Sequence, residues 1–194
     1  MGNKEIQKQR KMKYFIESAK EIIKEDGIKG VTARKVGQRA GYSYATIYNY
    51  FNDLNTLLAY CAFDFLEDCY KYLISFKDET KDAKEQVISY ALAYFRYFAE
   101  NPDIFHLIFI EELGELPEEL VNSRPSVAKH LRDSIVKCAD EGYVKKEDVD
   151  LLGELITSSI HGKLLFFLKR SPVEEGDEIV TSIKNELDAF IKEQ

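Results

Sequence analysis

Two residues that favour helix N-termini, Thr32 and Ser43, stand on either side of a glycine, Gly41. A threonine or serine hydroxyl at an N-cap accepts a hydrogen bond from a free first-turn amide, and glycine ends a helix where a left-handed conformation is needed. The pattern therefore predicts a helix of about eight residues ending at Ala40, a turn containing Tyr42, and a second short helix from Ser43. The second helix is expected to direct three side chains toward the core: Ile47, Tyr48 and Phe51.

An amphipathic helix is predicted before this pair, from about Lys4 to Asp26. Its apolar residues recur at i, i+4, i+7 and i+8, which places them on one face: Phe15, Ala19, Ile22 and Ile23. Gly27 follows in the position of a helix C-cap. The first part of the chain is therefore expected to form a three-helix domain with a helix-turn-helix, and we place its bounds at residues 1–52.

The remainder, residues 53–194, is expected to form a larger helical domain. No run of alternating β-branched residues predicts a strand there, and the whole chain contains only four prolines. We therefore predict an all-α fold, in which a mobile loop occupies residues 112–125. The further helices are expected at these positions: Leu54–Phe76, Asp82–Glu100, Asp103–Glu112, Ser126–Glu141, Glu147–Arg170 and Gly176–Lys192.

The last two expected helices differ in how their apolar residues are distributed. Leucine, isoleucine and phenylalanine cover more than one face of residues 147–170, whereas residues 176–192 have a single apolar stripe. A helix that is apolar on most sides must be buried on most sides. We expect a homodimer through these two helices, with Gly153, Ser158, Ser159 and Gly162 allowing close approach. A core formed within one chain is the alternative.

The net charge of −7 is unevenly distributed along the chain. Residues 1–50 contain 11 Lys and Arg against 5 Asp and Glu, and the rest contains 16 against 29. A basic end joined to an acidic body suggests that only the first part touches a polyanion. Five basic side chains near the start would supply nonspecific attraction to phosphates, although a solvated helix face is the alternative: Lys4, Lys8, Arg10, Lys11 and Lys13.

The run from Val31 to Phe51 resembles the helix-turn-helix of the TetR/AcrR family of transcriptional regulators. The segment from Asn101 to Phe105 also looks like the family's helix-opening Asn-Pro segment. The resemblance implies operator DNA as a partner, a homodimer, and a larger domain that senses a small molecule. These residues carry it: Thr32, Ala40, Gly41, Ser43, Thr46, Ile47, Tyr48, Tyr50, Phe51, Leu57 and Leu58.

In such proteins the second helix of the motif enters the major groove, and the first braces it against the backbone. The resemblance implies phosphate contacts for Thr32, Ser43, Tyr48 and Tyr50 and base contacts for Tyr44, Ala45, Thr46 and Asn49. An asparagine can pair with adenine, and an alanine methyl can touch the thymine methyl. The expected DNA-binding residues are Thr32, Arg34, Tyr42, Ser43, Tyr44, Ala45, Thr46, Tyr48, Asn49 and Tyr50.

Two positions depart from the family pattern. The family commonly has a basic residue where Tyr44 stands and a backbone-contacting lysine where Leu54 stands. In this chain the recognition helix contains no Lys or Arg at all. We therefore expect an A·T-rich operator or one that is recognised by its shape.

Aromatic residues in the larger domain suggest an apolar ligand pocket with polar groups, although most are expected to belong to the core. His161 would donate a hydrogen bond to a ligand, or remain a satisfied core histidine. The effector is expected to be apolar or aromatic. The expected pocket residues are Tyr94, Phe98, Phe105, Phe109, His161 and Phe166.

No catalytic motif, cofactor motif or metal-ligand spacing occurs in the sequence, and its three cysteines are expected to be structural thiols. The absence of a signal-like segment and of an 18-residue apolar run predicts a cytoplasmic protein without a membrane partner. We expect a repressor that a small molecule releases from its operator. A helical small-molecule-binding protein or enzyme without DNA binding is the alternative.

Overall fold

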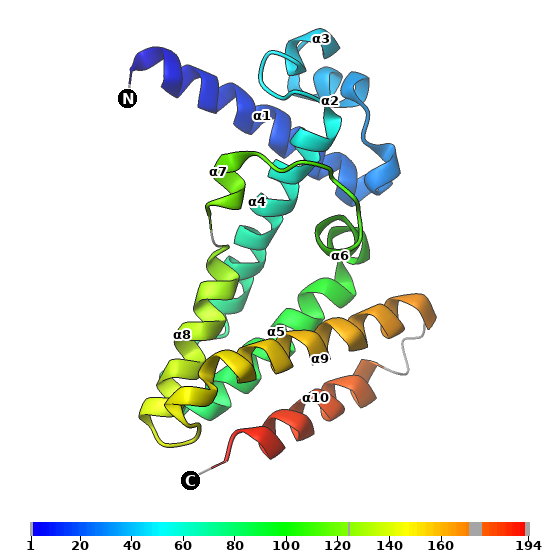
Figure 1. Cartoon of the computed structure of the whole chain (residues 1–194). Coiled ribbons are helices and arrows are strands. Elements are labelled where there is room, and N and C mark those ends of the chain that lie inside the picture. Colours follow the sequence, from blue (N-terminus) through cyan, green and yellow to red (C-terminus); the bar gives the residue numbers. More distant parts are fainter. Residues whose placement is uncertain (1, 124, 171–175, 193–194) are drawn as a thin grey trace. The chain divides into compact units, whose positions relative to one another are not determined.

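The computed structural model describes residues 2–123, 125–170 and 176–192. Within these residues the chain forms helices and turns without a strand, which confirms the all-α prediction (Figure 1). The helices are α1 (Asn3–Asp26), η1 (Ile28–Gly30), α2 (Ala33–Ala40), α3 (Tyr44–Ile47), α4 (Leu54–Ile74), α5 (Ala83–Glu100), α6 (Pro102–Phe109), α7 (Glu118–Val121), α8 (Ser126–Asp140), η2 (Lys146–Asp148), α9 (Val149–Arg170) and α10 (Gly176–Phe190).

The predicted helices are present, with bounds that shift by a few residues. The side chain of Asp82 caps α5 by accepting a hydrogen bond of 2.7 Å from the amide of Glu85. The helix expected over Asp103–Glu112 is shorter, because α6 ends at Phe109. Part of the expected loop at residues 112–125 is helical, since α7 forms after Pro117.

The chain divides into two compact units. Unit 1 comprises Met1–Phe65 and Asp103–Arg124, and unit 2 comprises Leu66–Pro102 and Pro125–Gln194. This division differs from the predicted domains 1–52 and 53–194, since unit 1 also contains the first part of α4 and most of α6. The predicted bounds describe functional domains and stay a prediction.

Unit 1 is built around the face of α1 that begins at Phe15. The Phe15 side chain is fully buried, and Val36, Ile47 and Phe51 are buried with it. The expectation that Ile47 and Phe51 face the core is confirmed. The same expectation for Tyr48 is wrong, because this side chain is 51% exposed. The chain leaves regular helix after Ile47, so the helical periodicity that would turn Tyr48 inward ends before it.

An ion pair between a buried lysine and a partly exposed aspartate joins α1 to the first part of α4. Lys20 is only 4% exposed, and its ammonium group pairs with the carboxylate of Asp64. The same ammonium lies 4.9 Å from the centre of the Phe65 ring, where a cation is favoured by the ring's electrons. Removing one partner of such a pair leaves a buried charge without compensation, so the pair holds the two helices in one arrangement.

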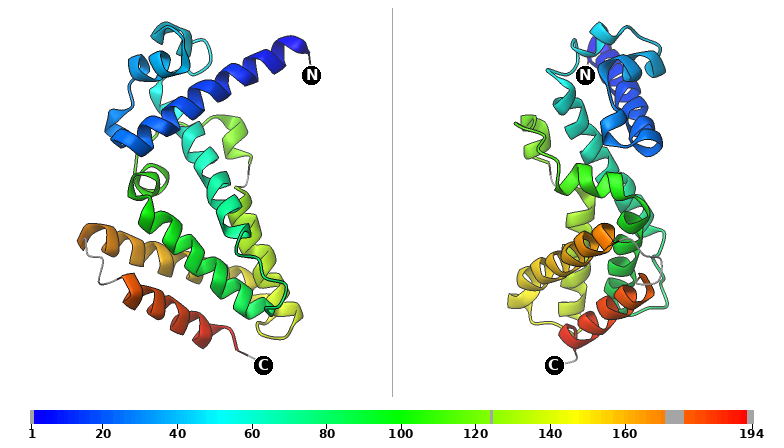
Figure 2. Two further views of the ribbon diagram at one scale, coloured as in Figure 1. Left: turned by 180° about the vertical axis from the view of Figure 1, so that it is seen from behind. Right: turned by 90° about the vertical axis from the view of Figure 1, so that its right-hand side faces the viewer.

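In unit 2, α5 packs against α8, α9 and α10, and α9 packs against α8 and α10 (Figure 2). The core consists of apolar side chains from these helices, among them Val87, Ala91, Ile135, Ile156, Ile160, Leu164, Ile183 and Leu187. The three cysteines, Cys61 in unit 1 and Cys69 and Cys138 in unit 2, are buried free thiols. Burial raises the pKa of the Cys69 thiol to about 12.

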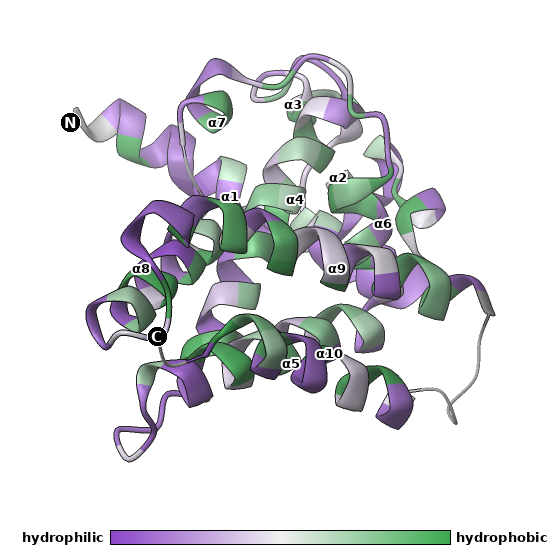
Figure 3. Ribbon diagram, turned by 60° about the horizontal axis from the view of Figure 1, so that its bottom comes forward, coloured by the Kyte–Doolittle hydropathy of each residue, from purple (hydrophilic) through white to green (hydrophobic). Residues whose placement is uncertain are grey.

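Helix α9 contains a long apolar stretch, although no apolar run of this length was expected from the sequence. The stretch Lys146–Lys169 is long and apolar enough to cross a membrane by length and composition alone, and 22% of its most apolar window is buried within the chain. Figure 3 shows the apolar stretches along α9 and α10. Such a helix also occurs in the core of a soluble protein. Four large apolar side chains of α9 stay exposed within the single chain: Leu151, Leu155, Leu165 and Phe166.

Candidate nucleic-acid interface

Helix α2 begins and ends as its sequence predicts. The Thr32 hydroxyl accepts a hydrogen bond of 3.2 Å from the amide of Lys35, which confirms the N-cap. Gly41 ends the helix in a left-handed conformation with φ of 78°. The amide of Tyr42 then donates to the carbonyl of Gly37 at 2.8 Å. These bonds fix the turn that leads into α3.

Helix α3 is shorter than expected and differs at its start. Ser43 occupies the N-cap position, but its hydroxyl bonds the hydroxyl of Thr46 at 2.9 Å instead of a backbone amide. The amides of Tyr50 and Phe51 both donate to the carbonyl of Ile47, at 2.9 and 3.0 Å. The chain thus continues as tight turns after the helix. The expected side-chain cap at Ser43 is wrong, because the hydroxyl pairs with the Thr46 side chain instead.

The side chain of Phe15 contacts aromatic rings on both sides of α3. Its ring lies 5.3 Å from the ring of Tyr42, before α3, and 5.7 Å from the ring of Tyr50, after α3. The Phe51 ring adds an edge contact at 6.4 Å. Aromatic rings at these separations attract one another beyond the area they bury. Tyr42 and Tyr50 are therefore half-buried supports as well as expected DNA contacts.

The remaining expected DNA-binding residues lie on the surface of unit 1. Tyr44 is 61% exposed and Tyr48 51% exposed, while Ile47 between them is fully buried. Thr46 is half-buried, and the other expected contacts are exposed: Thr32, Arg34, Ser43, Ala45 and Asn49. The ten residues thus lie on α2 and its N-cap, on the turn, on α3 and on the turns that follow α3. Their contact with DNA stays a prediction.

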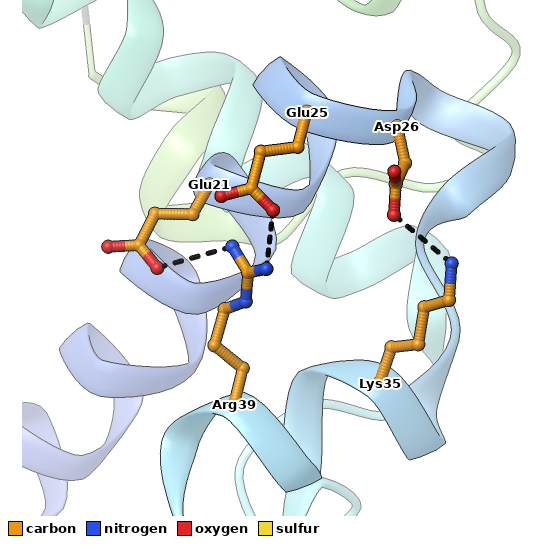
Figure 4. A network of polar contacts seen from close by, with 5 residues as sticks. All are labelled: Glu21, Glu25, Asp26, Lys35 and Arg39. Atoms are coloured by element: carbon orange, nitrogen blue, oxygen red, sulfur yellow. Dashed lines mark hydrogen bonds and ion pairs between the residues drawn. The ribbon is translucent and has the colours of Figure 1, made fainter.

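Two basic residues of α2 form ion pairs with carboxylates of α1 at the surface (Figure 4). Arg39 pairs with Glu25 and, at 3.5 Å, with Glu21, and Lys35 pairs with Asp26 at 3.2 Å. The hydrogen bond from Arg39 holds the pKa of Glu25 below its ordinary value. Sequence reasoning missed this network, although Glu21 and Glu25 stand at the i, i+4 spacing that places two carboxylates side by side.

The expected pocket residues fall in different parts of the fold. In unit 2, the Tyr94 hydroxyl shares a hydrogen bond of 2.8 Å with Nε2 of His161, and the Phe98 ring lies 4.8 Å from the Tyr94 ring. Burial raises the pKa of Tyr94 and lowers that of His161. In unit 1, Phe105 and Phe109 contact each other at 5.1 Å.

The sixth expected pocket residue, Phe166 of α9, is 64% exposed within the chain. Unit 2 also has a groove between α9 and α10, and none of the expected pocket residues lines it. These residues do: Leu155, Ile156, Ser159, Ile160, Ile183, Glu186, Leu187 and Phe190. Within the groove, Glu186 accepts hydrogen bonds from Lys163 at 2.6 Å and Ser159 at 2.6 Å, which joins the two helices. Among the described residues no His, Cys, Asp and Glu side chains gather as a metal site.

Solved structures share this fold. RolR in complex with resorcinol has a TM-score of 0.73 and 19% identity over 94% of this chain and 89% of that one. FadR from Bacillus subtilis in complex with stearoyl-CoA has a TM-score of 0.65 and 20% identity over 92% and 98%. A TetR family transcription regulator from Marinobacter aquaeolei VT8 has a TM-score of 0.61 and 18% identity over 93% and 97%.

No curated protein matches the sequence. The helix-turn-helix segment does match a known family. Residues 15–61 match the family of bacterial regulatory proteins named after tetR, and the matched segment runs from Phe15 through α2 and α3 into α4. With the helix-turn-helix in place and a helical body behind it, residues 15–61 form a helix-turn-helix segment of the kind found in bacterial regulatory proteins of the tetR family.

Proposed function

We propose that this protein is a repressor that binds operator DNA as a homodimer and leaves it when a small molecule binds to the helical body. The observation that carries the proposal is the division of side chains around α3. Ile47 and Phe51 are buried, whereas Tyr44, Tyr48 and Asn49 are exposed. A short helix held this way presents its outer side chains to a DNA groove.

Within this surface we assign base contacts to Tyr44, Ala45, Thr46 and Asn49, and phosphate contacts to Thr32, Ser43, Tyr48 and Tyr50. The remaining two expected residues, Arg34 and Tyr42, lie beside the phosphate contacts. The exposed amide of Asn49 can form two hydrogen bonds with adenine. Because α3 and the turns after it contain no Lys or Arg, the Arg–guanine contact is not part of this recognition.

The test begins with an operator selected in vitro from random duplexes by the wild-type protein. Asn49→Ala is expected to cost about 1–3 kcal/mol of binding free energy and to relax discrimination at one position. Asn122→Ala, which removes an exposed amide elsewhere in unit 1, is the matched control and should bind like the wild type. A folded, dimeric Asn49→Ala, Tyr48→Phe double variant with unchanged affinity and selectivity would refute the proposal.

The dimer is proposed to form through α9 and α10. Apolar side chains stay exposed on these helices in the single chain: Leu151, Leu155, Leu165, Phe166 and Phe190. Full burial of such a side chain contributes on the order of 1.5–3 kcal/mol, and covering the part that is still exposed contributes a share of this, which favours a partner surface of the same kind. Two recognition helices in such a dimer would lie about 34–36 Å apart, or a multiple of that, and bind a near-palindromic site.

Leu155→Glu tests the interface, because it places a charge where the partner helix is expected. Leu116→Glu is the matched control, since Leu116 of unit 1 is 45% exposed and Leu155 is 43% exposed. Sedimentation at micromolar concentration should show a dimer for the wild type and for the control, and a monomer for Leu155→Glu. A wild-type protein that sediments only as a monomer contradicts the proposed assembly.

The effector is proposed to be apolar or aromatic, with Tyr94 and His161 as the polar groups of its pocket. Support comes from the shared hydrogen bond of these side chains, which lies among the aromatic residues of unit 2. It also comes from the relatives, since RolR binds resorcinol and FadR binds stearoyl-CoA. Phe98 and Phe166 of unit 2 are proposed as apolar lining, and the role expected for Phe105 and Phe109 of unit 1 stays a prediction from the sequence. Helix α4 has residues in both units and is the proposed route of coupling.

A thermal-shift screen of phenols and acyl thioesters tests the sensor. A compound at about 100 times its Kd stabilises the native protein by about 2.7 kcal/mol, so a true ligand raises the melting temperature clearly. The same compound should lower operator affinity at fixed salt. Tyr94→Phe, which removes only the hydroxyl, should weaken a phenol more than an alkyl ligand. A ligand that binds tightly without changing operator affinity is not the effector.

A further inference from the structure

The N-terminal turns of α1 extend beyond the helix-turn-helix (Figures 1 and 2). Every residue from Lys4 to Arg10 is exposed, and burial in α1 begins only at Phe15. In Figures 1 and 2 these turns and α3 both lie at the top of the view, and the turns project to one side. The extension contains one acidic residue, Glu5. It therefore adds a projecting, strongly basic helix to the domain expected to bind DNA.

The basic residues of this extension do not share one face. Lys4, Lys8 and Lys11 continue, at alternating steps of four and three, into the buried positions Phe15, Ser18 and Ile22. Steps of four and three residues keep side chains on one face of a helix. The face of α1 that packs onto the domain is thus continued by three lysines where the helix leaves the domain. We call Lys4, Lys8 and Lys11 the lysine stripe.

The innermost lysine shows where the stripe lies. The ammonium group of Lys11 is 6.0 Å from the centre of the Tyr42 ring, in the turn between α2 and α3. Within the described part of the chain no carboxylate pairs with Lys4, Lys8 or Lys11. Like charges at i, i+4 on a helix cost about 0.2–0.5 kcal/mol each, so the stripe favours an anionic partner.

Several other cations of unit 1 are already engaged with carboxylates, although Arg34 of α2 is exposed. Lys35 and Arg39 of α2 are paired with α1 carboxylates, Lys20 is buried against Asp64, and no Lys or Arg occurs from residue 40 to residue 70. Affinity for a duplex nevertheless depends on basic groups that neutralise phosphates. The lysine stripe adds three such charges, and its innermost member, Lys11, reaches the turn before α3.

We propose that the lysine stripe binds the phosphate backbone of the DNA that flanks the sequence recognised by α3. The extension from Lys4 to Lys13 is about 14 Å long at 1.5 Å per residue, which corresponds to about four base pairs of duplex. Each half of the operator therefore has an outer segment that is held without sequence recognition. The inference rests on the proposed DNA binding and adds a second contact to it.

The same helix provides a control with equal charge. Arg10 and Lys13 are exposed like Lys4 and Lys8, but they lie on the side of α1 away from the stripe. The variants K4Q/K8Q and R10Q/K13Q each remove two positive charges from exposed positions, and both retain Lys11 and its contact with Tyr42. A general electrostatic effect changes both variants equally, whereas a contact made by one face changes only the first.

The experiment measures affinity by fluorescence anisotropy from 50 to 200 mM salt, on the selected operator with and without four flanking base pairs at each end. With flanks, K4Q/K8Q is expected to lower the slope of log affinity against log salt by about 1.8 per subunit, or about twelvefold over this range. R10Q/K13Q should stay close to the wild type. Without flanks, the wild type and K4Q/K8Q should have similar slopes.

Several outcomes overturn the inference. Equal losses in the two variants mean a general charge effect, and unchanged slopes mean that the stripe does not touch DNA. An altered sedimentation coefficient for K4Q/K8Q points to the acidic body of a second copy as the partner. Binding to phosphatidylserine vesicles that K4Q/K8Q abolishes, with DNA slopes unchanged, points to a membrane. If the wild type selects no sequence at all, the proposed function fails instead.

Discussion

A bulkier side chain at Gly37 should test how tightly the helix-turn-helix is built. Gly37 is buried inside α2 and faces the chain that leads into α3. A Cβ atom there would lie 3.0 Å from the carbonyl oxygen of Tyr42, 3.0 Å from the amide nitrogen of Tyr44 and 3.1 Å from its Cα atom. All three are backbone atoms, so no flexible side chain can move aside.

Two variants separate the effects of size and helix propensity. Gly37→Ala gains about 0.5–1 kcal/mol from its better helix propensity, which offsets the strain of contacts that are tight by a few tenths of an ångström. Its stability should therefore stay near that of the wild type. Compared with Gly37→Ala, Gly37→Val adds two further methyl groups, which must displace the Tyr42–Tyr44 backbone. Overpacking of this kind costs about 1–3 kcal/mol.

Urea unfolding gives the stability of each variant, and anisotropy on the selected operator gives its affinity. Gly37→Val should lower the free energy of unfolding by about 2 kcal/mol and weaken operator binding more than tenfold, because α3 is pushed away from α2. If Gly37→Val is as stable as Gly37→Ala and binds the operator equally well, the close approach of α2 to α3 does not position the recognition residues.

Further changes test other parts of the structure. Tyr48→Phe removes an exposed hydroxyl, so it should weaken binding to all duplexes without changing the urea midpoint. Phe15→Ala should cost about 3–5 kcal/mol, measured by urea unfolding, because it opens the contact between α1 and the turns around α3. Burial holds the pKa of His130 and His161 below the ordinary value of 6.5, so the unfolded chain binds more protons than the folded one. The free energy of unfolding should therefore fall as the pH drops from 7.5 to 5.5, and His130→Phe should reduce that fall.

Local sequence signals predicted the helix-turn-helix well because local chemistry determines its ends. Thr32 caps α2 through its own hydroxyl, and Gly41 supplies the left-handed residue after it. Both depend on residues within one turn of the chain. The same reasoning failed at Ser43, where the alternative partner Thr46 is equally local and a pattern of residue types does not decide between them.

Contacts between distant segments could not be predicted in this way. Folding brings Arg39 of α2 to Glu21 and Glu25 of another helix, which its position in the sequence does not reveal. Lys20 was one of many lysines in α1, and only the tertiary structure buries it beside Asp64. The sequence gives the number of charges in a domain, whereas packing decides which of them remain available to a partner.

The consequence is a separation between attachment and recognition. The recognition surface around Tyr44 and Asn49 carries no formal charge, so its contacts with bases depend little on salt. The lysine stripe carries charge without a means of distinguishing bases, so its contribution falls steeply with salt and is equal for all sequences. Raising the salt concentration should therefore weaken specific and nonspecific binding in parallel, and the ratio between them should stay nearly constant. An arginine in a recognition helix would supply both charge and base recognition from one side chain. In this protein the charged residues and the recognition residues lie on different helices, so each can be changed independently.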